Sequence, residues 1–319
     1  MAGRLADFAI READRADRQA LVDRLRRDSF LFLPGLLPVE MIAQVRQAVL
    51  DRLADVGWLA EGSDPKLALP GEQTHHDRGR MAGAYREDDQ WRVGYRGVQS
   101  LECLHALAHC PELLGVLSTL LGGEPVVHPR KIARISFPGI VYPTPPHQDA
   151  LFNKTTTDVL TVWIPLGDCP LPMGNLRVLR GSASDGALPV LPADGLGGER
   201  VDVDEDDPRW VEGDYRAGDV ILFHGYTVHM AGANQSGQLR VSLDCRYQSS
   251  AEPVKPAVLL PHGFGAGVLP SWTDLTRDWA STRWVEVAQP VRIATVPPPV
   301  PAPSRLLSGA SVDIPEAES

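Results

Sequence analysis

Two histidines and one aspartate in this sequence have the residue types of a metal site. His147 and Asp149 stand two residues apart, and His229 follows much later in the chain. Two histidines and one carboxylate are the ligands of mononuclear non-haem Fe(II) sites, which keep further positions open. We therefore predict that His147, Asp149 and His229 bind Fe(II) and form the catalytic centre. The short H-x-D motif alone is weak evidence, because most such tripeptides occur on surfaces by chance.

A segment that follows His229 has the groups that a dicarboxylate co-substrate needs. Residues 238–248 alternate between apolar and polar side chains, as expected for a strand. The polar face carries Arg240 and Ser242, a planar guanidinium and a hydroxyl that together suit a carboxylate. This interpretation requires the polar face to point inward, whereas the polar face of a strand commonly points to solvent. The arginine also favours His229 over the nearby His224 as third ligand.

Short β-like segments separated by Gly, Pro and Asp make up the second part of the chain and must position these residues. Residues i and i+2 of a strand point to the same side, so a strand would present His147 and Asp149 together. Many short strands are typical of a sandwich or barrel, and helices that precede them disfavour a parallel sheet. We expect strands near residues 125–137, 146–150, 158–166, 174–180, 219–224, 227–231 and 238–248.

Helices are expected before this β-rich part. Residues 38–58 have apolar side chains at helical spacing, and residues 13–33 combine a helix with the short strand Phe30–Leu33. Residues 99–122 predict two short helices broken at Pro111.

Two segments lack periodicity, and we expect long loops at residues 60–98 and 182–210. The last part of the chain is rich in proline and predicts a disordered or surface-lying tail. We therefore predict one domain over residues 1–285, with helices at about 10–122, a β-rich core at about 124–250 and a tail at 286–319.

Composition limits the kinds of partner. The formal net charge is −10 and the pI about 5.4, which argues against nucleic acid or an anionic membrane surface as the main partner. The four cysteines show no CxxC pairing, so we expect reduced thiols. We see neither a secretory signal nor an apolar run of membrane-spanning length, and predict a soluble cytoplasmic protein with a small-molecule partner.

Several short motifs follow one another in order along the chain. They are Pro146-His147-Gln148-Asp149, Val162-Trp163-Ile164-Pro165-Leu166, Gly174-Asn175-Leu176 with Arg180-Gly181-Ser182, Gly218-Asp219-Val220-Ile221-Leu222-Phe223, and His229 with Asn234 and Arg240. This order resembles the phytanoyl-CoA dioxygenase family of Fe(II)- and 2-oxoglutarate-dependent oxygenases, over roughly residues 25–250. The resemblance implies a mainly β fold with flanking helices around a double-stranded β-helix (jelly-roll, cupin-like) core.

The resemblance also implies cofactors and residue roles. It assigns Fe(II) to the two histidines and the aspartate named above, and 2-oxoglutarate and O2 as co-substrates. It places the distal carboxylate of 2-oxoglutarate on Arg240, with Ser242 as a helper. Trp163 and Arg134 match family positions near the co-substrate, although a core aromatic and a solvent-facing arginine are the alternatives. Related halogenases replace the metal-binding carboxylate by a small residue, so the intact Asp149 favours hydroxylation or another C–H oxidation.

We thus predict an oxygenase that hydroxylates an unactivated C–H bond of a small molecule, with a secondary metabolite favoured, and releases succinate and CO2. Two other classes stay open. One is a catalytically silent jelly-roll protein that binds a small ligand, although the complete ligand set and Arg240 speak against it. The other is a cupin-like metal enzyme that does not use 2-oxoglutarate, which would not need Arg240 near its metal.

Overall fold

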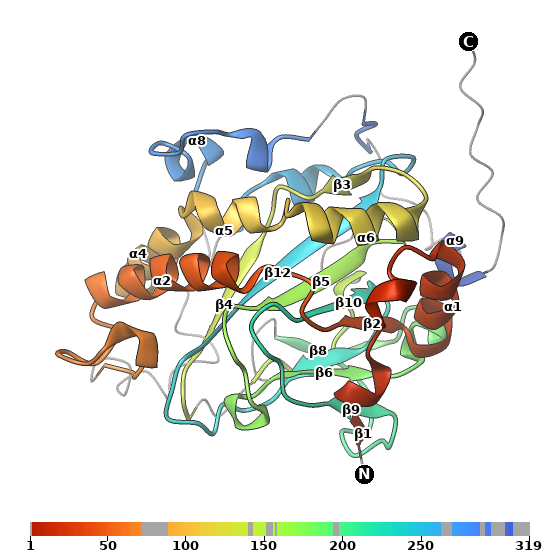
Figure 1. Cartoon of the computed structure of the whole chain (residues 1–319), viewed down its shortest axis with the longest axis horizontal. Coiled ribbons are helices and arrows are strands. Elements are labelled where there is room, and N and C mark those ends of the chain that lie inside the picture. Colours follow the sequence, from red (N-terminus) through yellow and green to blue (C-terminus); the bar gives the residue numbers. More distant parts are fainter. Residues whose placement is uncertain are drawn as a thin grey trace.

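Two β-sheets lie face to face, and helices cover the outer side of the larger one (Figure 1). This computed structural model describes residues 2–71, 89–139, 143–150, 156, 158–193, 198–262, 270–287, 291–294 and 304–308. In Figure 1 the helices lie above the larger sheet and the smaller sheet lies below it. The structure confirms the predicted mainly β fold with flanking helices and a jelly-roll core.

The larger sheet is centred on two adjacent strands, β5 (Leu160–Pro165) and β12 (Arg240–Ser249). Every pairing in this sheet is antiparallel. Thr161 of β5 lies opposite Arg246 of β12, so their side chains share one face of the sheet. The strand order is β2 (Phe30–Leu33), β10 (Val220–His224), β5, β12 and β3 (Pro125–Val127), and β4 (Ile132–Ser136) also pairs with β12.

The smaller sheet ends at β11, the strand that begins with His229. Gly174, at φ 73°, has no room for a side chain because the backbone of Gly232 lies against it, which brings the start of β6 close to the end of β11. β1 pairs with β9 in parallel, and the other pairings are antiparallel. The order is β1 (Gly3–Arg4), β9 (Trp210–Glu212), β6 (Leu176–Leu179) and β11 (His229–Ala231), and β7 (Val190–Pro192) and β8 (Glu199–Val201) form a separate hairpin.

Helices from the first part of the chain pack on the larger sheet. They are α1 (Arg18–Asp28), α2 (Val39–Asp55), α4 (Asp89–Gln99), α5 (Glu102–Leu107) and α6 (Pro111–Leu121). α1 begins at the side chain of Asp17, which accepts a hydrogen bond from the amide of Ala20. α6 ends at Gly122 in the left-handed conformation. The predicted amphipathic helix over 38–58 and the break at Pro111 are confirmed.

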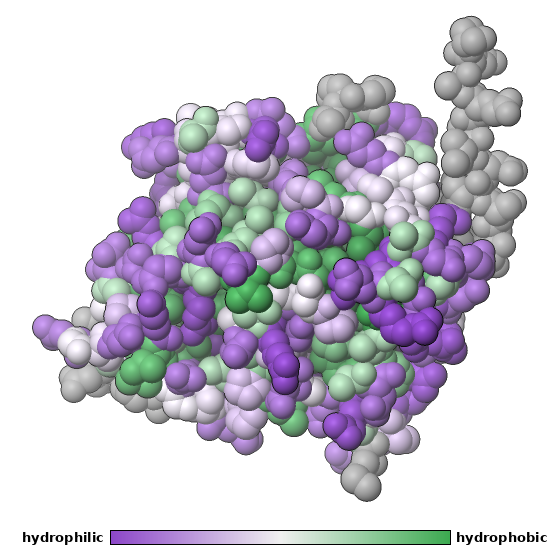
Figure 2. Space-filling view, viewed as in Figure 1, coloured by the Kyte–Doolittle hydropathy of each residue, from purple (hydrophilic) through white to green (hydrophobic). Residues whose placement is uncertain are grey.

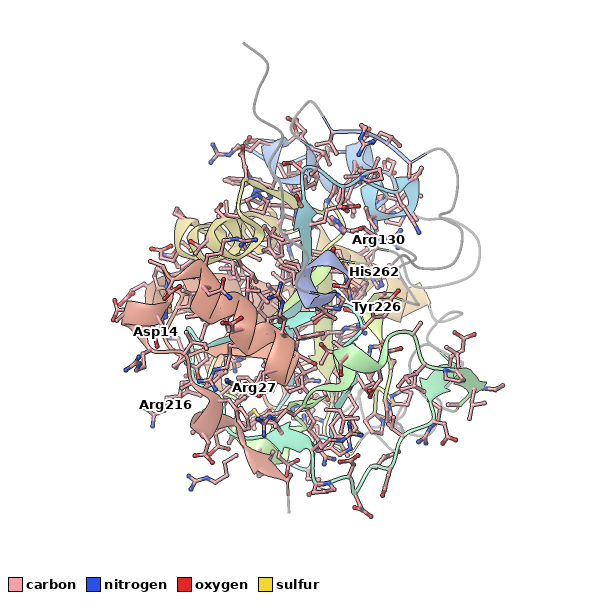
Figure 3. The ribbon with its side chains drawn as sticks, turned by 90° about the vertical axis from the view of Figure 1, so that its right-hand side faces the viewer. Asp14, Arg27, Arg130, Arg216, Tyr226 and His262 are labelled. Atoms are coloured by element: carbon pink, nitrogen blue, oxygen red, sulfur yellow. The ribbon has the colours of Figure 1, made fainter. Side chains whose placement is uncertain are left out.

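Two short α-helices come from the end of the chain, α8 (Trp272–Leu275) and α9 (Arg305–Ser308). Figure 3 shows α9, drawn in blue, beside the red helix α1. Leu306 of α9 is buried in the main hydrophobic core. Turns of 3-10 helix occur at Leu5–Phe8, Glu12–Asp14, Pro65–Leu67, Leu171–Met173, Ser182–Asp185, Pro256–Leu259 and Arg283–Val285.

β12 is buried on both faces. Leu243 and Cys245 belong to the same hydrophobic core as side chains of α2, α5 and α6. The alternate residues point the other way, into the space between the two sheets, and include Arg240 and Asp244. The inward direction of the polar face is the arrangement that a carboxylate-binding site requires.

Three predicted segments outside the candidate site differ from the structure. The loop expected over 60–98 is wrong for its last part, because residues 89–99 form α4, which buries Tyr95 and Val98; residues 72–88 lie outside the described residues. The strand expected over 125–137 is divided into β3 and β4. The loop expected over 182–210 contains the β7–β8 hairpin. Pro129, which cannot donate a backbone hydrogen bond, stands between β3 and β4.

Residues 102–121 are long and apolar enough to cross a membrane, by length and composition alone. In the structure they form the two helices α5 and α6, and 56% of the apolar window is buried inside the protein. Leu113, Leu117 and Leu120 pack into the main core, as expected for core helices. Figure 2 shows that polar and charged side chains cover most of the viewed face, with smaller apolar areas between them.

Candidate active site

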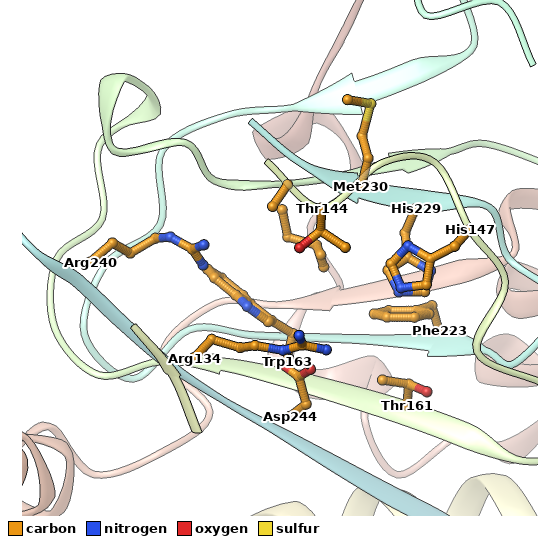
Figure 4. A pocket seen from close by; sticks show the side chains of 12 residues that line it. Arg134, Thr144, His147, Thr161, Trp163, Phe223, His229, Met230, Arg240 and Asp244 are labelled. Atoms are coloured by element: carbon orange, nitrogen blue, oxygen red, sulfur yellow. Dashed lines mark hydrogen bonds and ion pairs between the residues drawn. The ribbon is translucent and has the colours of Figure 1, made fainter. Parts of the chain in front are cut away.

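His147, Asp149 and His229 come together in one buried cluster. Their potential ligand atoms all lie within 4.8 Å of one another. The imidazole rings of His147 and His229 lie side by side in Figure 4, with 4.0 Å between their centres. Ligand bonds of about 2.1 Å place neighbouring donor atoms about 3 Å apart around one metal ion, so small adjustments would let one ion bind all three.

A backbone pair sets the separation of the two histidines. The amide of His147 donates to the carbonyl of His229 at 3.0 Å, and the amide of His229 donates back at 3.0 Å. Residues paired in this way in antiparallel segments have side chains on the same face and Cα atoms about 5.5 Å apart. The pairing therefore brings together two residues that are distant in sequence.

The segment around His147 differs from the predicted strand 146–150. Only His147 pairs, in a single β-bridge, and Asp149 begins a helical turn. The expectation that a regular strand presents both side chains on one face is therefore wrong. The side-chain amide of Gln148 donates to the carbonyls of Gly186 and Tyr226 and turns the chain between the two ligands. Even so, His147 Nε2 and Asp149 Oδ1 lie 4.0 Å apart.

Both histidines are held in the form that binds metal. His147 Nδ1 donates to the carbonyl of Pro145 at 2.9 Å, and His229 Nδ1 donates to that of Thr227 at 3.0 Å. Because the proton resides on Nδ1, each Nε2 keeps its lone pair. Burial lowers the pKa of His147 to about 3 and also lowers the pKa of His229. Both rings are therefore neutral near pH 7.

Asp149 is held by an arginine that we did not predict. Nε and Nη2 of Arg246 donate to its two oxygens at 2.9–3.1 Å, and Thr161 Oγ1 donates to Oδ2 at 2.7 Å. Burial acts to raise the pKa of Asp149, but the positive charge of Arg246 and the other neighbours outweigh it and hold the pKa below its usual range. The carboxylate is therefore anionic, as a metal ligand must be.

Arg240 lies in the pocket that the two histidines line (Figure 4). It is 6% exposed, and its Nη1 donates to Ser242 Oγ at 3.1 Å. Its guanidinium lies 5.9 Å from the centre of the Trp163 ring. Within the described part of the chain, its buried Nε has no hydrogen-bond partner. A buried donor without a partner is costly, so this guanidinium fits an anionic ligand such as the carboxylate of 2-oxoglutarate.

The pocket around Arg240 has a cavity volume of about 30 Å³. Trp163 and Phe223 contribute to its apolar walls. Arg134 also lines it, and its Nε donates to Asp244 Oδ2 at 2.9 Å. Arg134 is thus a pocket residue with an acidic partner and not the solvent-facing arginine that the sequence left open.

Arg246, Thr161 and Asp244 are residues of this site that we did not predict. Asp244 and Arg246 lie on the same polar face of the strand as Arg240. If that face points inward, the alternation of residues already predicts that both side chains lie near the site. Thr161 is different, because only the register between β5 and β12 places it opposite Arg246.

His224 stands apart from the metal cluster. Its Nε2 lies 3.4 Å from Asp158 Oδ1 and 3.2 Å from Ser304 Oγ, a residue set that suggests a hydrolase. However, His224 Nδ1 accepts a hydrogen bond from the amide of Tyr226, so the proton is on Nε2. A ring in this form cannot take the proton of Ser304 as a triad requires. The cluster instead holds the C-terminal segment.

The fold and the site together define a class, the jelly-roll oxygenases that use non-haem iron and 2-oxoglutarate. The pattern of the phytanoyl-CoA dioxygenase (PhyH) family matches residues 25–242, which is more than half of the chain. This chain belongs to the phytanoyl-CoA dioxygenase family. The protein is therefore a 2-oxoglutarate-dependent oxygenase, with Fe(II), 2-oxoglutarate and O2 as its cofactors.

Individual relatives show the extent of the similarity. Phytanoyl-CoA dioxygenase domain-containing protein 1 of Danio rerio is 29% identical over 255 residues, which cover 69% of this chain and 86% of that protein. The 1-deoxypentalenic acid 11-beta-hydroxylase of Streptomyces arenae is 24% identical over 280 residues, covering 82% and 88%. The crystal structure of SnoN, a non-heme alpha ketoglutarate dependent epimerase from nogalamycin biosynthesis, matches with a TM-score of 0.50 and 22% identity, covering 80% of this chain and 94% of that one. The likeness to SnoN concerns the fold alone.

Proposed function

We propose that this protein hydroxylates an unactivated C–H bond of a small molecule while 2-oxoglutarate is oxidised to succinate and CO2. The observation that carries this proposal is that Arg240 lines the same pocket as His147 and His229. A cupin-like metal enzyme without 2-oxoglutarate would have no use for a buried guanidinium with an unpartnered nitrogen at this place. A silent binding protein would not need the complete ligand set.

The residues of the pocket have separate roles in this proposal. The two histidines and Asp149 would hold the iron, which supplies the activation of O2 when it is bound. Arg240 and Ser242 would bind the distal carboxylate of 2-oxoglutarate, and Trp163 would support that guanidinium with its ring. Arg134 would contact the co-substrate from β4. The intact carboxylate of Asp149 occupies the coordination position that a halide would need, which favours hydroxylation over halogenation.

The names of relatives support a proposal for the substrate class. One relative is named for the hydroxylation of 1-deoxypentalenic acid, and SnoN comes from nogalamycin biosynthesis. We therefore propose a small molecule of secondary metabolism as the substrate. All four cysteines are free thiols, which supports a location in the reducing cytoplasm.

The test begins with Fe(II) and 2-oxoglutarate in the absence of oxygen. The wild-type protein is expected to develop a weak visible charge-transfer band, and then to form succinate when a collection of metabolites is supplied with O2. Asp149→Ala and Asp149→Asn should abolish both signals. The exposed acid Asp206 offers a control, because Asp206→Ala should leave both unchanged. A folded wild-type protein that binds neither Fe(II) nor 2-oxoglutarate would refute the proposal.

A further inference from the structure

The two carboxylate oxygens of Asp149 have different surroundings. Oδ2 accepts hydrogen bonds from Thr161 Oγ1 at 2.7 Å, from Arg246 Nη2 at 2.9 Å and from Arg246 Nε at 3.1 Å. Oδ1 accepts from Nη2 at 3.0 Å, and it is the oxygen that lies 4.0 Å from Nε2 of His147. Oδ2 thus accepts three of these hydrogen bonds and Oδ1 accepts one, and Oδ1 is the oxygen near the ring of His147.

The anchor of Oδ2 is built on two adjacent strands at the centre of the larger sheet. Thr161 and Arg246 face each other across the central pair of strands, β5 and β12. The side chains of Arg246 and Asp149 are each 4% exposed. Asp244 Oδ2 lies 4.0 Å from Arg246 Nη2 and gives the guanidinium a second acidic neighbour. Paired strands of a buried sheet move little, so these donors have defined positions.

We propose that Arg246 and Thr161 are positioning residues that hold Oδ2 and present only Oδ1 to the iron. This inference rests on the proposed function. A carboxylate that binds through one oxygen leaves three positions of an octahedral ion open beside the two histidines. 2-Oxoglutarate and O2 would need these open positions. A carboxylate that bound through both oxygens would occupy one of them.

The chemistry of arginine suits this role. Its planar fork directs several N–H groups at one carboxylate, which the single ammonium of lysine cannot do. Arg246 Nη1 is buried and has no hydrogen-bond partner in the described part of the chain. An unpartnered donor costs stability. If Arg246 served only stability, its unpartnered Nη1 would work against that role.

The experiment compares Thr161→Val, Arg246→Lys and Arg246→Leu with the wild-type full-length protein. Each is titrated with Co(II) in place of Fe(II), and its visible spectrum is recorded before and after 2-oxoglutarate is added, because the intensity reports the coordination number. Loss of groups that orient a metal ligand weakens metal binding roughly 10- to 100-fold, and we expect this range for Arg246→Leu. Thr161→Val and Arg246→Lys should show smaller losses, with an altered spectrum in the presence of 2-oxoglutarate.

Arg180→Gln is the matched control. Arg180 Nε donates to the buried carboxylate of Asp28 at 2.7 Å, which is the same kind of bond outside the pocket. This variant should lose thermal stability but keep the Kd and the spectrum of Co(II). Thr161→Val retains the shape of the side chain, so it decides the question even where Arg246→Leu does not fold.

Two results would overturn the inference. Folded Thr161→Val and Arg246→Lys proteins with wild-type Co(II) affinity and wild-type spectra would show that the anchor does not position the ligand. A folded wild-type protein that binds no metal would overturn the proposed function itself, and the positioning role with it.

Discussion

Each side chain of the candidate iron site is oriented by hydrogen bonds to neighbouring groups. Backbone carbonyls hold Nδ1 of His147 and His229, and Arg246 with Thr161 holds Oδ2 of Asp149. Contacts of this kind select the tautomer and the rotamer before the metal binds. The ligands therefore lose little side-chain freedom on binding, which favours a high affinity for the metal.

At the scale of single residues, Arg240→Lys tests the proposed co-substrate site. A lysine keeps the charge but loses the planar fork, so it cannot bind a carboxylate through two parallel bonds. We expect a loss of about 2 kcal/mol or more, which raises the Kd of 2-oxoglutarate roughly 30-fold. The measurement is a titration of the anaerobic Fe(II) protein, followed by its charge-transfer band. Arg209→Lys is the control, because Arg209 is a half-exposed surface arginine, and this variant should leave the Kd of 2-oxoglutarate unchanged. If Arg240→Lys also left this Kd unchanged, the co-substrate would bind elsewhere.

Among the elements, strand β12 contributes side chains both to the hydrophobic core and to the candidate site. Its apolar residues pack against the helices. Of its alternate polar residues, Arg240 and Asp244 line the pocket and Arg246 binds Asp149. A shift of one residue in register would turn these side chains away from the pocket. The burial of Leu243 and Cys245 therefore also fixes where the guanidinium groups point.

A buried lysine precedes β4. Lys131 Nζ donates to the carbonyl of Trp284 at 2.6 Å and lies 3.5 Å from His109 Nε2. Among the described residues, no acidic side chain pairs with it. Burial lowers the pKa of Lys131 to about 7, lowers that of His109 to about 4 and raises that of Cys245 to about 12. Lys131 is thus the member of this group that titrates between pH 7 and pH 10.

Lys131→Met should change how stability depends on pH. The unfolded chain keeps the ordinary lysine pKa of 10.5, so between pH 7 and 10.5 it binds a proton that the folded protein has lost. Rising pH therefore stabilises the wild-type fold through this group, by up to about 1.4 kcal/mol per pH unit. Below pH 7 both states are protonated and this contribution stops changing.

Urea unfolding from pH 6 to pH 10 measures this effect. The free energy of unfolding of the wild type minus that of Lys131→Met should stay level up to about pH 7 and then increase toward pH 10. Groups that do not interact with Lys131 cancel in the difference. A difference that is constant over the whole range would show that the pKa of Lys131 is not lowered.

At the scale of the whole molecule, residues 304–308 near the end of the chain pack beside α1 at the edge of the core (Figure 3). Arg26 Nε of α1 donates to the carbonyl of Leu306 at 2.7 Å. Ser304 Oγ donates to the buried carboxylate of Asp158, and the amide of Leu306 donates to the same oxygen at 3.4 Å. Asp158 lies just before β5, the strand that carries Thr161 and Trp163. The division of the chain at residue 285 stays a prediction, although residues beyond it pack on the core.

Ser304→Ala tests whether the contacts of this C-terminal segment stabilise the core. Asp158 would keep its charge in a buried place with one donor fewer, which costs about 1–3 kcal/mol. We expect the Tm to fall by a few degrees in a thermal scan. The control is Ser184→Ala, because Ser184 also donates to a neighbouring group but is exposed. Equal Tm values for the wild type and Ser304→Ala would mean that the C-terminal segment does not hold the core.

Much of the fold could be predicted because its signals are local. The spacing of Ile42, Val45 and Val49 indicates the helix α2, and the alternation around Arg240 indicates the strand β12. The strand expected at 146–150 was wrong because Gln148 bonds to backbone groups that are distant in sequence. No local pattern contains that information.

The sequence by itself determined the family and predicted the ligand types and a co-substrate arginine, because these depend on residue identity and on order along the chain. The tertiary structure decided which face of β12 points inward, which arginine binds Asp149 and where Ser304 packs. These arrangements depend on strand register and on contacts between residues more than 90 positions apart, such as Arg246 with Asp149. Burial then gives them their strength, since charges and hydrogen bonds act more strongly away from water.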